Sequence, residues 1–289
     1  MPKLRAPGRN PIVLNPVRPS AAEEAWYRVR LRSLCDVMHR MTEAELTAAY
    51  PEVHTGTMTP QLSTTLGVME EHWTKIFSED AERIATEFVW RAVRHHDLSF
   101  STELRSKGFD VERPITASVA LDAKKQERKD FTIRFDISPE IQQKVKDRVI
   151  ENVDLIKKIP KTYHEKIRRA TEEAVLKGRE LREYTDTLKE LGAEDLRHAS
   201  MIARDQNNKI TGYVHQLRQQ ELGISKAKWS HTSYTLHPRE EHLDFDDETY
   251  DVDEGHDFDD GFGPVIPGEA INCGCLSRSI IPGYDEEEA

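Results

Sequence analysis

The feature that most constrains the fold is a series of long segments in which apolar residues recur at helical spacing. Several of these segments begin with a capping signal. Ser20 and Glu23 form a capping box, in which the serine hydroxyl accepts the amide of the third helical residue while the glutamate reaches back. Ser138 followed by Pro139 is typical of a second helix start. The sequence therefore predicts a predominantly α-helical chain.

The first fifty residues are predicted to form an arm and one helix. Residues 1–19 contain five prolines, which interrupt helices, so we expect an extended arm there. The helix that follows begins after Ser20, has a second capping box at Thr42 where it can break and restart, and ends before Pro51. Its expected core stripe consists of Trp26, Val29, Leu34, Val37, Met38 and Met41.

A second helical segment, beginning near Thr65, completes an N-terminal helical domain over residues 20–108. His95, His96 and Asp97 are expected near a helix end, where imidazoles complement the helix dipole. Beyond this point the periodicity fades, and we interpret residues 109–129 as a connector between domains.

Residues 130–225 are predicted to form a helical hub led by one strand. Alternation of apolar and polar residues indicates that this strand is half-buried. Its apolar positions are Phe131, Ile133, Phe135 and Ile137. A helix is expected from Pro139 to Pro160, because proline interrupts the hydrogen bonding of a helix interior. Three more helices are expected to end at glycines, namely Gly178, Gly192 and Gly223.

The C-terminal stretch, residues 226–289, is predicted to form a small α+β, loop-rich module. Trp229 lies in a short alternating segment typical of a strand. Residues 236–289 hold 17 acidic and 2 basic residues, a net charge of −15, whereas residues 1–235 carry a net charge of +4. We interpret the acidic run as a solvated loop, since it lacks the ligand spacing of an EF-hand. The expected fold class is therefore α+β with helix predominant.

Three cysteines without framework spacing favour a reducing compartment over a disulfide-bonded fold. Two of them follow several histidines, and thiolate and imidazole are ligands that tetrahedral zinc prefers. The candidate zinc ligands are His237, His242, Cys273 and Cys275. The single residue between the two cysteines is a tighter spacing than that of ordinary zinc knuckles. Two reduced, packed thiols are therefore the alternative interpretation.

No sequence motif indicates catalysis. The chain lacks a G-x-S-x-G nucleophile elbow, a P-loop, a G-x-G-x-x-G dinucleotide motif and an H-E-x-x-H metalloprotease motif. It also lacks a run of about 18 apolar residues, so no membrane span is predicted. The enzymatic alternative is a metal-dependent hydrolase or nuclease that uses His237, His242 and the neighbouring aspartates.

The second half contains several short motifs in a specific order. They are residues 151–160 (ENVDLIKKIP), 202–206 (IARDQ) and 218–224 (RQQELGI), then Trp229, His242 and residues 267–275 (PGEAINCGC). Each motif alone is a weak signal, but their order and spacing together are specific. Over about Phe131 to Pro282 the sequence resembles the head morphogenesis family of tailed bacteriophages, typified by the F protein of phage Mu.

The resemblance implies a minor head protein that acts in head assembly, without enzymatic activity. It implies a location in the virion, at the portal vertex or in the capsid interior, and in the host cytoplasm during assembly. The implied partners are the portal protein, a major capsid or scaffold protein and, as in some relatives, packaged DNA. An internal protein ejected with the genome is a further alternative.

Overall fold

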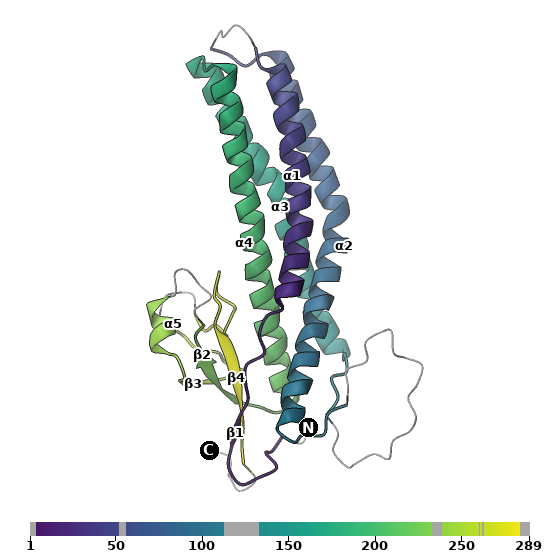
Figure 1. Cartoon of the computed structure of the whole chain (residues 1–289), viewed down its shortest axis with the longest axis vertical. Coiled ribbons are helices and arrows are strands. Elements are labelled where there is room, and N and C mark those ends of the chain that lie inside the picture. Colours follow the sequence, from purple (N-terminus) through teal and green to yellow (C-terminus); the bar gives the residue numbers. More distant parts are fainter. Residues whose placement is uncertain are drawn as a thin grey trace, which may run out of the picture. The chain divides into compact units, whose positions relative to one another are not determined.

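The fold is predominantly α-helical with one small antiparallel sheet, as the sequence predicted (Figure 1). The computed structural model describes residues 4–51, 56–112, 133–232, 239–259, 261 and 263–283. None of the described helices combines the length and apolar character needed to cross a membrane. The helices are α1 (Ala21–Ala49), α2 (Pro60–Ser106), α3 (Pro139–Lys177), α4 (Leu181–Glu221) and α5 (Glu240–Asp244). The strands are β1 (Ile12–Val13), β2 (Lys226–Ser230), β3 (Thr249–Asp251) and β4 (Leu276–Ile281).

The chain divides into two compact units, and each is built from segments that are distant in sequence. Unit 1 comprises Met1–Glu23, Val89–Val145 and Asp205–Ala289. Unit 2 comprises Glu24–Phe88 and Lys146–Arg204. Helices α1 to α4 each contribute residues to both units. The two units therefore do not follow the consecutive division of the chain that the sequence suggested.

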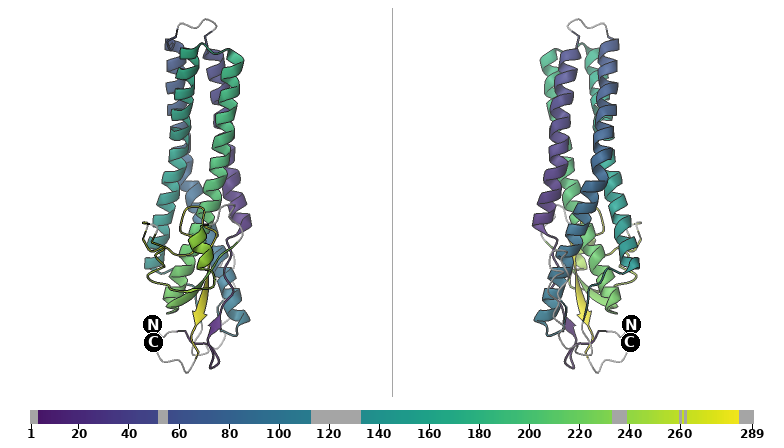
Figure 2. Two further views of the ribbon diagram at one scale, coloured as in Figure 1. Left: turned by 90° about the vertical axis from the view of Figure 1, so that its left-hand side faces the viewer. Right: turned by 90° about the vertical axis from the view of Figure 1, so that its right-hand side faces the viewer.

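Unit 2 is a four-helix bundle in which consecutive helices run antiparallel (Figures 1 and 2). Near one end, Tyr27 of α1 stacks on Phe88 of α2 at a centroid distance of 3.9 Å and donates a hydrogen bond to Asn152 of α3. Near the other end, Tyr50 stacks on Tyr184 of α4 at a centroid distance of 4.3 Å. These contacts are those of an up-and-down four-helix bundle.

A buried polar contact joins α1 to α4 within unit 2. His39 Nε2 lies 3.0 Å from Asp195 Oδ2, and both side chains are buried. Gly192, about one turn earlier on α4, faces the His39 ring, where an added Cβ would lie 3.1 Å from the ring atoms. The helix end predicted at Gly192 is wrong, because this glycine lies inside α4 and permits close packing of two helices.

The other helix boundaries show which of the predicted helix starts and ends are correct. Ser20 and Ser138 each accept a hydrogen bond from the amide three residues later, at 3.2 Å, which confirms both predicted helix starts. Gly178 and Gly223 follow α3 and α4 with φ angles of 63° and 67°, which confirms both predicted helix ends. The helix end predicted at Pro160 is wrong. Proline removes one backbone hydrogen bond there, but buried side chains on both sides of it keep α3 continuous.

The buried face of α1 includes Met38 of the expected core stripe but otherwise differs from that stripe. The buried residues are Tyr27, Leu31, Cys35, Met38, His39, Thr42, Leu46 and Ala49. Val29, Val37 and Met41 are instead between 39% and 54% exposed. α1 does not break at Thr42, whose side chain lies in the buried face. The stripe was assigned to the wrong face because two polar residues, His39 and Thr42, occupy core positions.

Unit 1 carries the antiparallel sheet, in which the strand order is β1-β4-β2-β3. The N-terminal arm supplies the edge strand β1, whose Ile12 lies opposite Ile281 of β4. The arm residues Leu4 and Leu14 are buried in one apolar cluster with Phe100 of α2. The arm is therefore an integral part of unit 1.

The strand expected to lead the helical hub is reduced to an isolated bridge in the described residues. Ile133 forms a parallel bridge with Val111, and both side chains are buried. Phe135 is also buried, but Ile137 is 51% exposed. Phe131 lies outside the described residues. The alternating residues therefore lie at one edge of the core, and in the described residues they do not form a ladder of strand hydrogen bonds.

A charged pair lies in the interior of unit 1. Arg218 of α4 is 1% exposed and donates two hydrogen bonds to the carboxylate of Asp97 on α2, at 3.0 and 2.7 Å. The same guanidinium donates to the carbonyl of Asp136 at 2.9 Å. On the other side of this pair, a ring nitrogen of His96 lies 3.0 Å from one of His215. His96 and Asp97 lie inside α2, which continues to Ser106. The helix end expected at these residues is therefore wrong.

Asp97→Asn is expected to destabilise the protein by about 3 kcal/mol, because it removes the buried carboxylate that faces a buried guanidinium and leaves only the partly exposed Glu221 as its counter-charge. Burial alone would raise the pKa of Asp97, but hydrogen bonds from His96 and Arg218 hold this pKa below its ordinary value. Chemical denaturation followed by circular dichroism measures the change. Asp36→Asn, which removes an exposed ion pair with Arg40, is the control and should cost less than about 1 kcal/mol. Equal losses in the two variants would contradict the prediction.

His164 of α3 is expected to make stability depend on pH. Its ring is buried, neither ring nitrogen has a hydrogen-bond partner among the described residues, and burial lowers its pKa from 6.5 to about 4. The unfolded chain therefore binds a proton that the folded chain does not, and stability falls as the pH drops below the unfolded pKa. In the unmodified protein, His164 should lower the free energy of unfolding by about 2 kcal/mol between about pH 7.5 and about pH 5. His164→Leu should abolish this loss.

Denaturation of the unmodified protein and the variant at both pH values gives this difference directly. His198→Leu, at an exposed position of α4, is the matched control and should leave the pH dependence unchanged. The same pH dependence in the His164 variant and in the unmodified protein would show that His164 is not responsible.

Candidate metal centre

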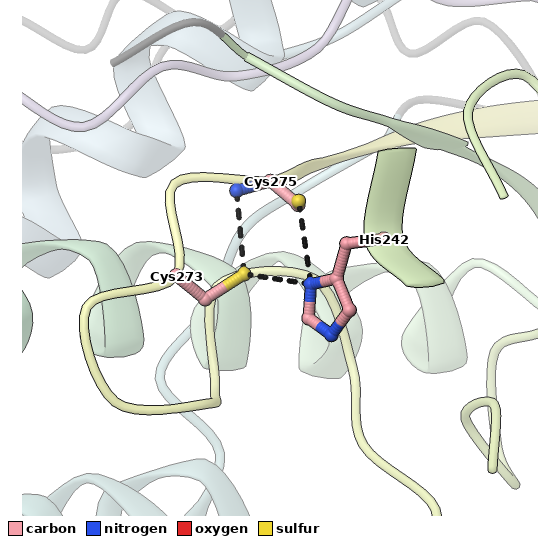
Figure 3. Close-up of side chains that lie close together, drawn as sticks. All are labelled: His242, Cys273 and Cys275. Carbon is pink, nitrogen blue, oxygen red and sulfur yellow. Dashed lines mark hydrogen bonds between the residues drawn. The ribbon is translucent and has the colours of Figure 1, made fainter. Parts of the chain in front are cut away.

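Two thiols and an imidazole meet in the C-terminal part of unit 1 (Figure 3). Cys273 Sγ lies 3.5 Å from His242 Nδ1, and Cys275 Sγ lies 3.7 Å from the same nitrogen. All three side chains are buried, and their potential ligand atoms lie within 4.8 Å of one another. The structure thus brings together three of the four residues that the sequence suggested as zinc ligands.

The fourth suggested ligand, His237, lies outside the described residues. A different histidine approaches the cluster, since His231 Nδ1 is 3.7 Å from Cys275 Sγ. His231 directly follows β2, and β2 pairs with the strand that directly follows Cys275. Sequence reasoning gave His231 no ligand role. The position of His231 at the end of β2, next to the start of β4, is the signal that could have identified it as a ligand.

An aromatic cluster surrounds the site. Trp229 of β2 is fully buried and confirms the strand predicted at this position. Its ring makes edge contacts with His242 of α5 and with Phe258, both at centroid distances of 5.1 Å. Phe258 also stacks on His242 at 4.3 Å. Packing from two sides therefore fixes the orientation of the imidazole that faces the thiols.

The turn that carries the two cysteines is held against α4. Asn208 of α4 donates a hydrogen bond to the carbonyl of the first cysteine at 3.0 Å. Asp205, one turn earlier, accepts a hydrogen bond from the amide of Asn272 at 2.6 Å. Gly212 permits the closest approach, because a Cβ there would lie 2.4 Å from the carbonyl oxygen of Pro267. α4 therefore serves as the rigid support of the site.

The two thiols influence each other's ionisation. The hydrogen bond between the two thiols lowers the pKa of Cys273 more than burial raises it. The same hydrogen bond, followed by burial, raises the pKa of Cys275. The amide of Cys275 also donates to Cys273 Sγ at 3.5 Å. The arrangement therefore favours a thiolate at Cys273. Both cysteines, like Cys35 in unit 2, are free of disulfide bonds.

The donor set is suited to a thiolate-binding metal. Among the described residues, no carboxylate joins the cluster. Asp246 accepts a hydrogen bond from the His231 amide, and Asp247 pairs with Lys228 and Arg278. The neighbouring aspartates thus have structural roles in the described part of the chain. The geometry gives no support to a hydrolase built from them.

The fold and the site define a helix-rich α+β protein with a buried Cys/His cluster beside a small sheet. Residues 165–278 match the family described as Phage Mu protein F like protein. This segment includes the C-terminal part of α3, all of α4 and β2, and every residue of the cluster. The match confirms the resemblance to the phage head morphogenesis family that the sequence motifs indicated.

The chain is also similar to an uncharacterized protein of Haemophilus influenzae, with 27% identity over 283 residues. The alignment covers 94% of this chain but 56% of the relative, so the chain spans just over half of the relative's length. No solved structure matches the chain. The similarity to this relative therefore extends to segments that the family match does not cover.

Gly212→Ala is expected to destabilise unit 1, because the new Cβ would meet a backbone carbonyl at 2.4 Å. Gly67→Ala in α2 is the matched control. Nothing lies within 4 Å of its added Cβ, and alanine should stabilise the helix by about 0.5–1 kcal/mol. The two substitutions should therefore shift the free energy of unfolding in opposite directions in chemical denaturation. A Gly212→Ala variant as stable as the unmodified protein would show that α4 and the 267–275 turn do not approach closely.

Proposed function

We propose that the chain is a minor head protein of a tailed bacteriophage, which acts in head assembly at the portal vertex or in the capsid interior. The observation that carries this proposal is the family match over residues 165–278. Binding to the portal protein is the central activity in this proposal, and a major capsid or scaffold protein is a further assembly partner. No catalytic step is assigned to the chain, which passes from the host cytoplasm into the virion.

An exposed apolar strip on α1 supports a role in docking. Val29, Val37 and Met41 follow one row of residues four apart along the helix surface, and each is between 39% and 54% exposed. Apolar side chains grouped on a helix surface are typical of protein interaction sites. We therefore assign this strip as the part of unit 2 that contacts the portal protein.

DNA is a secondary ligand in this proposal. Lys157, Lys158 and Lys161 are exposed within about one turn of α3, a spacing that suits phosphate contacts. Residues 124–183 carry 17 basic and 12 acidic residues, so the excess of positive charge is modest. Such a surface suits salt-sensitive contact with packaged DNA rather than recognition of a base sequence.

The proposal is tested by co-expression of the full chain with the portal protein from the same genome. The chain should co-purify with the portal ring, and cryo-electron microscopy should place α1 at the contact. Val37→Asp combined with Met41→Asp should weaken this association at least about tenfold, which corresponds to about 1.4 kcal/mol. Val68→Asp, at a 53% exposed position of α2, is the matched control and should leave the association unchanged.

Two results would contradict the proposal at different levels. An unmodified chain that associates with neither the portal protein nor the capsid or scaffold proteins would contradict the head-assembly function. Equal loss of association in the α1 double variant and in the α2 control would contradict the assignment of the contact to α1 while leaving the function in place.

A further inference from the structure

Three side-chain donors meet in unit 1, from α5 and from the turn before β4, and a fourth, on the residue that follows β2, lies beside one of them. We propose that this region binds one structural zinc ion through two thiolates and two imidazoles, supplied by Cys273, Cys275, His242 and His231. This set differs from the one suggested by the sequence in its fourth ligand. The proposal is independent of the function in head assembly.

The distances between sulfur and nitrogen are those of a tetrahedral zinc site. Zinc binds a thiolate sulfur at about 2.3 Å and an imidazole nitrogen at about 2.0–2.1 Å. At the tetrahedral angle these bond lengths separate sulfur from nitrogen by about 3.6 Å. The observed distances are 3.5 Å from Cys273 to His242, 3.7 Å from Cys275 to His242 and 3.7 Å from Cys275 to His231. The atoms of His242, Cys273 and Cys275 are therefore already spaced for a shared ion, and His231, which lies beside Cys275 alone, would complete the set by a small shift toward the ion.

The register of the sheet brings the fourth ligand to the cluster. β2 and β4 are antiparallel, and Ser230 at the end of β2 lies opposite Leu276 at the start of β4. The next residue of one strand is therefore opposite the preceding residue of the other, which places His231 beside Cys275. The β2–β4 ladder sets this pairing without a metal ligand, so the two donors are adjacent before any metal binds.

Two further contacts hold His231 in this position. Its amide donates a hydrogen bond to Asp246 at 2.7 Å, and Asp246 lies just beyond α5, which carries His242. The hydroxyl of Thr232 donates to the carbonyl of Gly274, between the two cysteines, at 2.6 Å. The segment that carries His231 is thus tied to both other ligand-bearing segments. Such outer contacts orient metal ligands and raise affinity.

The charge of the proposed site is balanced. The side chains of His242, Cys273 and Cys275 are each 3–4% exposed, so an uncompensated charge there would be costly. Two thiolates and two neutral imidazoles together carry two negative charges, which a divalent zinc ion cancels. A tetrahedral set of two sulfurs and two nitrogens also favours zinc over harder ions such as magnesium or calcium.

A bound metal would add to the contacts that hold α5 in place. This helix has five residues, and its N-cap residue Arg239 makes no side-chain capping hydrogen bond. Helices this short are not stable in water without tertiary contacts. A bond from His242 to a metal that is also bound by the 273–275 turn fixes α5 to the start of β4. Zinc would thus add to the cohesion that the apolar cluster around Trp229 provides.

The full chain, expressed with zinc in the medium and purified without chelator, should contain about one zinc ion per chain by elemental analysis. Exchange for cobalt should give the intense ligand-field bands of a tetrahedral site and a sulfur-to-cobalt charge-transfer band. His231→Ala should weaken zinc binding by more than about 100-fold, because loss of an outer contact alone costs about 10–100-fold. His231→Cys should restore binding with a stronger charge-transfer band, since it supplies a third thiolate.

His237→Ala is the matched control, because His237 is the fourth ligand that the sequence alone suggested. It should leave the zinc affinity and the cobalt spectrum unchanged. An unmodified chain that binds neither zinc nor cobalt would overturn the site. Unmodified affinity and spectrum in His231→Ala, or a loss of affinity in His237→Ala, would overturn the assignment of the fourth ligand.

Discussion

The buried ion pair between Asp97 and Arg218 is the interaction on which unit 1 depends. It joins α2 to α4, and the contact of the guanidinium with the Asp136 carbonyl adds the segment before α3. Desolvation offsets most of the attraction in a buried pair, so its main contribution is not net stability. We interpret its role as specificity, because few arrangements of these segments satisfy both charges. His215 extends the network to Ser279 of β4 at 3.2 Å, so the position of the sheet is specified as well.

The parts of the fold that could be predicted from the sequence are those that depend on neighbours in the chain. The caps at Ser20 and Ser138 act on amides three residues away, and Gly178 and Gly223 accommodate the left-handed turn that directly follows a helix. The strand at Trp229 likewise follows from local alternation. In the candidate site, the nearby cysteines and the histidine of one short helix were identifiable because their residue types alone indicate metal chemistry.

The parts that could not be predicted depend on contacts between distant segments. The sequence does not distinguish Gly192 from a glycine that ends a helix. Only the packing of the His39 ring against it explains why α4 continues through this position. The buried face of α1 was misassigned because a core histidine, His39, is stabilised by Asp195, 156 residues away in the chain. His231 was not selected as a ligand for the same reason, since its place beside Cys275 follows from strand pairing.

The acidic run of the C-terminal region has a structural role in that strand pairing. Lys228 of β2 lies directly opposite Arg278 of β4, and like charges in such a cross-strand pair are destabilising. Asp247 offsets this repulsion, because its carboxylate pairs with Lys228 at 2.7 Å and with Arg278 at 3.0 Å. It does so from a φ of 64°, a conformation that aspartate tolerates better than most residues. The register that brings His231 beside Cys275 is therefore supported by an acidic residue whose local sequence indicated only a solvated loop.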